Sequence, residues 1–323
     1  MDEKLSGKLF NEGLISEKTY RQQSASPSQP LFSLHWELKT LLYIGVALLS
    51  TGLGILIYKN TDTIGHQAIL LFIASISAGS FYWSVRHKKP FSRERVTSSG
   101  ALFDYVLLLG CLTLLSFLAY LQFQYSFFGT HYGLAVFIPM IILFYVAYEF
   151  DHMGILSLAI TNLGLWLGLT INPVYLIEGH LGDYSLLNTY LFLGILLLVA
   201  AWLSERYNFK KHFRFSYLHF GLNITFITLL AGYFTAYDKP WSLLWIAGTF
   251  GVGYVLYKDA FRHKSFFFLL LIILYLYIAA SALVVRCLIL AGEVSLMLGL
   301  LYFIVSASAL IKLLIFIHKK LKA

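Results

Sequence analysis

Apolar runs of about 20 residues recur along almost the whole chain, separated by short polar connections. A helix of that length is roughly 30 Å long, which matches the hydrocarbon core of a bilayer. Of the 323 residues, 59% are hydrophobic and only 12% are charged, against about 25% charged in an average soluble domain. Helices satisfy their backbone polar groups internally, and the alternating pattern of a membrane β-strand is not seen. The sequence therefore predicts an all-α integral membrane protein with about ten transmembrane helices.

The predicted transmembrane domain covers residues 31–323, and its short connections make consecutive helices antiparallel neighbours. The ten predicted spans are residues 38–58, 64–85, 102–123, 131–149, 152–172, 188–204, 215–236, 240–257, 265–290 and 293–317.

The distribution of positive charge predicts the orientation of the spans. Lysine and arginine gather before the first span and after the second, sixth, eighth and tenth, whereas the alternate connections carry only Lys59 and Lys239. Because basic loops stay on the cytoplasmic side, both termini are predicted to be cytoplasmic. The tight connection at residues 149–152 has no basic residue. Ten spans are still favoured, because omitting one there would place every later basic cluster on the opposite side.

Residues 1–30 are polar and form a separate N-terminal segment. Leu5, Leu9 and Phe10 share one helical face and Gly13 is a C-terminal stop, so the pattern predicts a short amphipathic helical hairpin. Such a hairpin is too small to be stable alone, and it is expected to lie on the membrane surface or on a cytoplasmic protein partner. The alternative is a partly ordered tail. The segment lacks the apolar core of a cleaved signal peptide, so the first span is expected to be an uncleaved anchor.

Composition and motif searches exclude several functional classes. The net charge of +8 comes from short basic clusters between apolar runs, which are topology signals rather than a nucleic-acid surface. Cys111 and Cys287 lie in apolar runs and imply no disulfide framework. HExxH, GxSxG, P-loop and dinucleotide-binding patterns are all missing from the sequence. The sequence thus predicts no nucleic-acid partner, cofactor, metal or catalytic residue.

Polar side chains in two apolar spans form a candidate polar cavity. Ser216, His219 and Asn223 share one helical face at spacings of three and four residues, and Asn162 lies in the fifth span. Together these four residues are candidates to line a cavity reaching inward from the cytoplasm, for a small solute or a lipid. The alternative is that they join neighbouring helices by hydrogen bonds.

Arg286 and Glu293 form a candidate ion pair, because charged groups within a membrane are costly and often functional. Arg286 lies near the outer end of the ninth span, and Glu293 begins the tenth. The alternative is a purely structural clasp, in which the Arg286 side chain extends toward the interface.

Two connections gather acidic residues and histidine. Glu149, Asp151 and His152 form the tight turn between the fourth and fifth spans, where a proton relay and simple helix capping are the two interpretations. The outer loop at 171–190 contains Glu178, His180 and Asp183, but their spacing matches no metal-binding motif.

Four stretches of the sequence resemble a known family. They are LFNEGLISEKTY (9–20), HWELKTLLYIGVALLSTGLGILIYKN (35–60), YEFDHMGILSLAITNLGLWLGL (148–169) and KSFFFLLLIILYLYIAASALV (264–284). These stretches are similar to the bacterial predicted membrane proteins of domain-of-unknown-function family 2157. The resemblance implies a bacterial inner-membrane protein and brings no reaction, substrate or catalytic residue.

Two functional hypotheses follow from the sequence. The first is a non-enzymatic membrane protein that transports or allows permeation of a small solute or a lipid, based on the ten spans and their polar stripes. The second is a membrane scaffold or sensor that docks a cytoplasmic partner through the N-terminal hairpin.

Overall fold

The computed structural model describes residues 12, 40–52, 54–55, 65–97, 100–129, 132–171, 183–290 and 295–322. The chain divides into two compact units, residues 1–53 and 54–323, which are described separately. In the first unit the described helix is Thr40–Gly52, a short apolar helix within the predicted span 38–58. The predicted hairpin of residues 1–30 lies outside the described residues, apart from Glu12.

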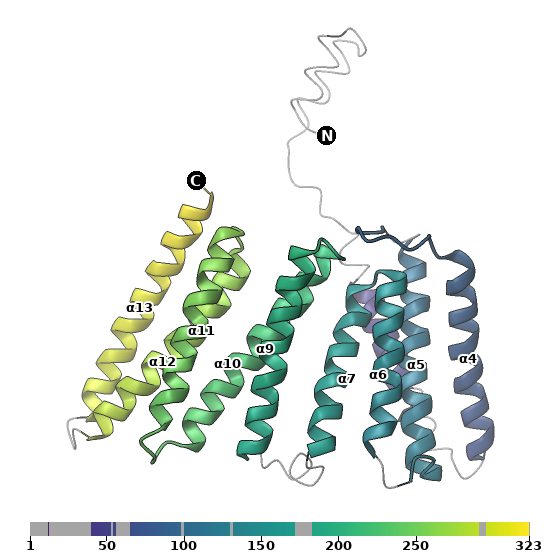
Figure 1. Cartoon of the computed structure of the whole chain (residues 1–323), viewed down its shortest axis with the longest axis horizontal. Coiled ribbons are helices and arrows are strands. Elements are labelled where there is room, and N and C mark those ends of the chain that lie inside the picture. Colours follow the sequence, from purple (N-terminus) through teal and green to yellow (C-terminus); the bar gives the residue numbers. More distant parts are fainter. Residues whose placement is uncertain are drawn as a thin grey trace. The chain divides into compact units, whose positions relative to one another are not determined.

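Every regular element described in the second unit is a helix, which confirms the all-α prediction (Figure 1). The elements are α4 (His66–His87), α5 (Ala101–Tyr125), α6 (Tyr132–Phe150), α7 (Met153–Ile171), α9 (Tyr184–Arg206), the 3₁₀ helix Lys211–Phe213, α10 (Arg214–Thr235), α11 (Ser242–Arg262), α12 (Phe266–Leu290) and α13 (Ser295–Lys322).

Eight of the described helices are long and apolar enough to cross a membrane, namely α4, α5, α6, α7, α9, α10, α12 and α13. The helix α11 covers residues 242–257 of the predicted span 240–257 but is not among these eight. Its 21 residues give it a length of about 31 Å, but Lys258, Asp259 and Arg262 lie at its end and lower its hydropathy. The full count of ten spans stays a prediction.

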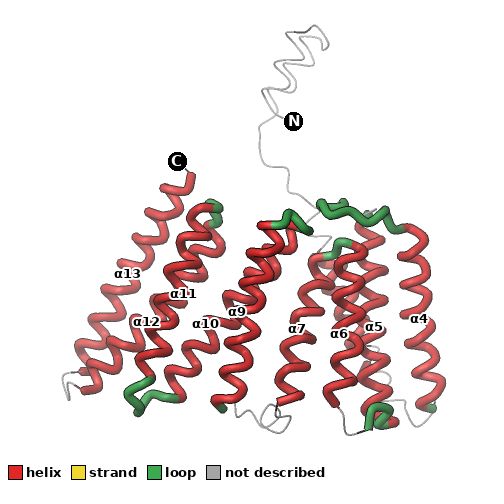
Figure 2. Tube along the Cα trace, viewed as in Figure 1, coloured by secondary structure: helices red, strands yellow, loops and turns green. Residues whose placement is uncertain are grey.

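Consecutive helices of the second unit pack against each other and run in opposite directions (Figure 2). As a result, the connections at residues 88–97, 151–152, 207–213 and 263–265 lie at the same end of the helices. We call this the basic end, because three of these four connections carry lysine or arginine.

The most extensive helix contact in the described unit is between α9 and α10, and two glycines make it close. A Cβ atom on Gly194 would lie 2.9 Å from the backbone nitrogen of Thr225, and one on Gly221 would lie 3.1 Å from the carbonyl oxygen of Gly194. Leu197 and Leu222 are almost fully buried beside them. Small residues let membrane helices approach closely, so that packing replaces the hydrophobic effect as the source of stability.

Candidate functional site

Four charged or titratable side chains meet at the basic end of α9, α10 and α11. Arg214, in the first turn of α10, places its Nε 2.9 Å from Glu205 Oε2 of α9. Its Nη2 donates to Asp259 Oδ2 of α11 at 2.5 Å. His263, just after α11, has Nε2 2.6 Å from Glu205 Oε1 and Nδ1 2.8 Å from the carbonyl oxygen of Asp259. These contacts join the four residues into one group, which we call the ionic cluster.

The ionic cluster is half-buried, which makes its contacts stronger than ordinary surface ion pairs. The Arg214 side chain is 14% exposed, and the other three are between 27% and 35% exposed. A single guanidinium pairs with two carboxylates through separate nitrogens, the charge-assisted geometry in which arginine is most effective. In the cluster, two carboxylates are therefore partnered by one arginine and one histidine.

The ionic cluster lies at one end of an apolar groove of about 510 Å³ between α9, α10 and α11. This volume lies within the range of roughly 300–1,000 Å³ found for small-molecule sites. Glu205, Arg214 and Asp259 line the charged end. The apolar walls include Ile195, Val199 and Trp202 of α9, Leu218 of α10, and Gly251 and Val255 of α11.

The groove has the depth of one bilayer leaflet and opens on the outside of the helices. Ten residues separate Ile195 from Glu205, which corresponds to about 15 Å of helix, and the hydrocarbon core of a bilayer is about 30 Å thick. Trp202 and Val255 on its two edges are 54% and 64% exposed. A Cβ atom on Gly251 would meet nothing within 4 Å, so this part of the wall faces open space.

The ionic cluster also contains three residues with metal-ligating side chains. One ligand atom from each of Glu205, Asp259 and His263 lies within 4.8 Å of the others. Arg214, however, already pairs with both carboxylates, and its positive charge would repel a divalent cation. We therefore interpret the four residues as an ion-pair cluster and not as a metal centre.

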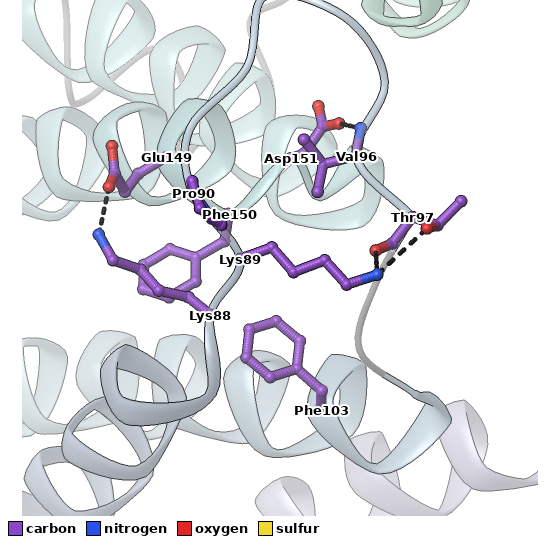
Figure 3. Close-up of a pocket in the computed structure, with 9 residues that line it drawn as sticks. All are labelled: Lys88, Lys89, Pro90, Val96, Thr97, Phe103, Glu149, Phe150 and Asp151. Atoms are coloured by element: carbon purple, nitrogen blue, oxygen red, sulfur yellow. Dashed lines mark hydrogen bonds and ion pairs between the residues drawn. The ribbon is translucent and has the colours of Figure 1, made fainter.

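A second buried cluster at the basic end is centred on Asp151, between α6 and α7. Asp151 Oδ2 accepts the backbone N–H of Val96 at 2.5 Å, as seen in Figure 3, and Oδ1 accepts from His212 Nε2 at 2.6 Å. The Nζ of Lys210 lies 3.1 Å from the same Oδ1, and the two side chains are only 1% and 2% exposed. In addition, the backbone N–H of Lys210 donates to the backbone carbonyl oxygen of Arg93 at 2.8 Å. This Asp151 junction joins three of the connections at the basic end.

The neighbours of Asp151 in the tight turn face other partners, which argues against the proton relay. Glu149 pairs with Lys88 of the preceding connection (Figure 3). His152 Nδ1 accepts the backbone N–H of Ile155 at 3.2 Å and so caps the first turn of α7. The pocket beside Glu149 and Asp151 has a volume of only about 20 Å³, room for roughly one water molecule. The contacts favour helix capping and loop anchoring.

Three of the four predicted polar cavity residues are engaged in hydrogen bonds between or within helices. Asn223 donates to the carbonyl oxygen of His219 at 2.7 Å and accepts from Tyr275 of α12 at 2.8 Å. Asn162 donates to the carbonyl oxygen of Leu158 in its own helix at 2.9 Å. Ser216 is buried. The structure brings His219 and Asn223 together, but the groove is lined by other residues, and these contacts favour the interhelical role.

The remaining predicted site residues are only partly described. Arg286 donates from Nη1 to Ser242 Oγ of α11 at 2.7 Å, and its guanidinium lies 5.0 Å from the ring centre of Tyr237. Glu293 lies outside the described residues, so the predicted Arg286–Glu293 ion pair stays a prediction. Asp183, from the outer loop, caps α9 by accepting the N–H groups of residues 185 and 186; Glu178 and His180 also lie outside the described residues.

The sequence interpretation missed the ionic cluster because it treated lysine and arginine near the helix ends only as topology signals. A usable signal was present in the acids. Glu205 and Asp259 stand next to Arg206 and Lys258, at helix ends that otherwise carry only positive charge. A carboxylate at such a position can form an ion pair with a particular lysine or arginine side chain.

The long apolar helices and the loops that join them in turn define a polytopic α-helical membrane protein. Residues 8–156 match the model of the family of predicted membrane proteins DUF2157, which confirms the resemblance seen in the sequence. The match covers just under half of the chain and ends in the first turn of α7, so the groove and the ionic cluster lie beyond it. No curated protein and no solved structure matches the chain.

Proposed function

We propose that this protein binds a membrane lipid in the groove between α9, α10 and α11 and moves lipid within the bilayer. The observation that carries the proposal is the order of surfaces along the groove, which is apolar over the depth of one leaflet and charged at its end. A lipid has the same order, with acyl chains in the hydrocarbon core and a charged headgroup at the interface.

The exposure of the groove favours a lipid over a small polar solute. Its edges, Trp202 and Val255, are exposed apolar side chains on the outside of the helices, where acyl chains surround a membrane protein. A polar solute would have to leave water and enter a wall of apolar side chains without hydrogen-bond partners, which is costly. An acyl chain enters from a medium as apolar as the wall and gains packing contacts there.

Filling the groove tests the proposal. In Gly251→Leu the new side chain starts in open space, so it occupies the groove without a backbone clash. The matched control is Gly79→Leu in α4, where a new Cβ atom also meets nothing within 4 Å and which does not line this groove. Both substitutions replace an exposed helical glycine, so their effects on helix propensity are alike.

The measurement is leaflet exchange of a fluorescent phospholipid in vesicles containing the full chain, followed by quenching of the outer leaflet. We expect exchange above that of protein-free vesicles for the wild type and for Gly79→Leu, and a loss of most of it for Gly251→Leu. Equal exchange by all three proteins, or no exchange above protein-free vesicles, would refute the proposal.

For location, we propose the bacterial inner membrane, with the basic end in the cytoplasm. The bias of lysine and arginine supports this orientation. In a background lacking Cys111 and Cys287, an impermeant maleimide should label Lys239→Cys in spheroplasts and label Lys264→Cys only after permeabilisation. The reverse pattern would overturn the orientation.

A scaffold or sensor role is the second candidate, and one observation favours it. The family match begins at residue 8, so it includes most of the N-terminal segment and excludes the groove. If residues 1–30 dock a partner, deleting them should abolish co-purification of one defined protein while lipid exchange stays at the wild-type rate. Unchanged co-purification would exclude this role for the segment.

A further inference from the structure

We infer that the groove selects a zwitterionic aminophospholipid, whose ammonium group binds Glu205 and Asp259 and whose phosphate binds Arg214. This inference rests on the proposed function, because it requires a lipid in the groove, and it adds the chemistry by which the headgroup is recognised.

The two carboxylates provide the site for the ammonium group. Both are partly exposed and both line the charged end of the groove. An ionised carboxylate has about four acceptor positions, and the contacts with Arg214 and His263 use only some of them. Asp259 has the greater remaining capacity, because its Oδ1 is 3.4 Å from His263 Nδ1, beyond a good hydrogen bond. A primary ammonium, with three N–H donors, matches this pair of acceptors.

Arg214 provides the site for the phosphate. Its contacts with Glu205 and Asp259 use Nε and Nη2, and Nη1 carries two further N–H donors. The side chain lines the groove between the two carboxylates, so donors and acceptors alternate there. In an ethanolamine headgroup, a phosphate that accepts hydrogen bonds and an ammonium that donates them are joined by two carbons, so the headgroup matches this alternation. The carboxylates also hold the guanidinium in place, which lowers the entropy lost on binding.

The charge of the ionic cluster predicts which headgroups are disfavoured. A glycerol headgroup would bring a phosphate close to the carboxylates of Glu205 and Asp259 without a cation for them to bind, and repulsion would oppose its binding. A choline headgroup balances the charge but has no N–H to donate to Glu205 or Asp259. The expected order of affinity is therefore ethanolamine, then choline, then glycerol headgroups.

Native mass spectrometry of the detergent-solubilised full chain tests this order. The probes are dioleoyl phospholipids with ethanolamine, choline or glycerol headgroups, which share the same acyl chains. We expect the ethanolamine lipid to bind about tenfold more tightly than the glycerol lipid, equivalent to about 1.4 kcal/mol. In Glu205→Gln that ratio should fall to about two or three.

The matched control is Glu149→Gln. Glu149 is an acid at the same basic end that is partly exposed and paired with Lys88, away from the groove. This variant should keep the wild-type selectivity. Wild-type binding to all three lipids with equal affinity overturns the inference, even if Glu205→Gln does not fold.

The experiments distinguish lipid binding in the groove from recognition of the lipid headgroup. If Gly251→Leu removes lipid binding but the three headgroups bind equally, the groove holds lipid without recognising ammonium, and only this inference fails. If lipid binding does not respond to Gly251→Leu, the groove is not the lipid site and the proposed function fails with it.

Discussion

Replacing Asp151 by asparagine should strongly destabilise the basic end of the second unit. The substitution keeps the shape of the side chain and replaces its carboxylate by a neutral amide. It also suits the backbone, because Asp151 has a φ of 58°, and asparagine tolerates this left-handed conformation better than most residues. Any loss of stability therefore reports on the loss of the carboxylate and not on backbone strain.

The expected magnitude follows from the burial of Asp151 and Lys210. At 3.1 Å, two unit charges attract by about 5 kcal/mol for an effective dielectric constant of about 20. Most of this attraction offsets the cost of taking both groups out of water. Removing one partner leaves the other charge buried and unpaired, and such changes cost about 3–5 kcal/mol. The amide introduced by Asp151→Asn would also present N–H donors to His212 or Lys210, which are donors themselves.

The assay is reversible unfolding of the purified chain in mixed micelles, combined with a double-mutant cycle. Asp151→Asn alone should lower the free energy of unfolding by about 3–5 kcal/mol. Adding Lys210→Met removes the orphaned charge and keeps an apolar stem against Phe91, whose ring centre lies 4.8 Å from the Lys210 ammonium. The double variant should therefore be more stable than Asp151→Asn, which is a non-additive result.

The control is Glu149→Gln, which breaks the more exposed pair with Lys88. Exposed pairs contribute at most about 1 kcal/mol, so this loss should be small. The reasoning would be wrong if Asp151→Asn and Glu149→Gln had equal effects, or if Lys210→Met added to the loss caused by Asp151→Asn.

Two further substitutions test helix packing, with the same unfolding assay. Gly194→Ala places a Cβ atom 2.9 Å from the Thr225 backbone and should cost about 1–3 kcal/mol by overpacking, whereas Gly79→Ala, in open space, should be neutral or slightly stabilising. Tyr275→Phe removes the hydrogen bond to Asn223 and should cost only about 0.6 kcal/mol, with lipid exchange unchanged; a loss of exchange would return Asn223 to the functional site.

Hydropathy predicted the apolar centre of each helix well and the polar ends less well. The predicted span 102–123 corresponds to α5 at Ala101–Tyr125, because apolar residues fill the helix almost to its ends. The span 188–204 began late, since α9 starts at Tyr184 after the Asp183 cap. The last span stopped at 317, although α13 continues to Lys322. A hydropathy window detects what lies in lipid, whereas caps and charged last turns extend the helix into the interface.

The candidate site was less accessible to sequence reasoning, because it depends on which helices become neighbours. His219 and Asn223 do share a face, as their spacing predicted, but spacing cannot distinguish a cavity wall from a bond to Tyr275 of another helix. Arg214 and Asp259 are 45 residues apart, and nothing in either local sequence specifies that α10 and α11 bring them together. The orientation of the helices could be predicted from the same basic residues, because it depends only on the side of the membrane where they lie and not on which side chains they contact.

The helix α11 connects the topology to the site. Its connections to α10 and α12, residues 236–241 and 263–265, are short, so α11 returns over the same depth that its two neighbours cross. Its 21 residues reach about 31 Å, close to the thickness of the hydrocarbon core, so a spanning α11 has its last turn, with Asp259, near the interface. In that arrangement, the charges that make α11 less apolar than its neighbours lie at the depth of lipid headgroups. There Arg214 of α10 and Glu205 of α9 meet Asp259. Asp259, one of the three charged residues that lower the hydropathy of α11, also completes the ionic cluster.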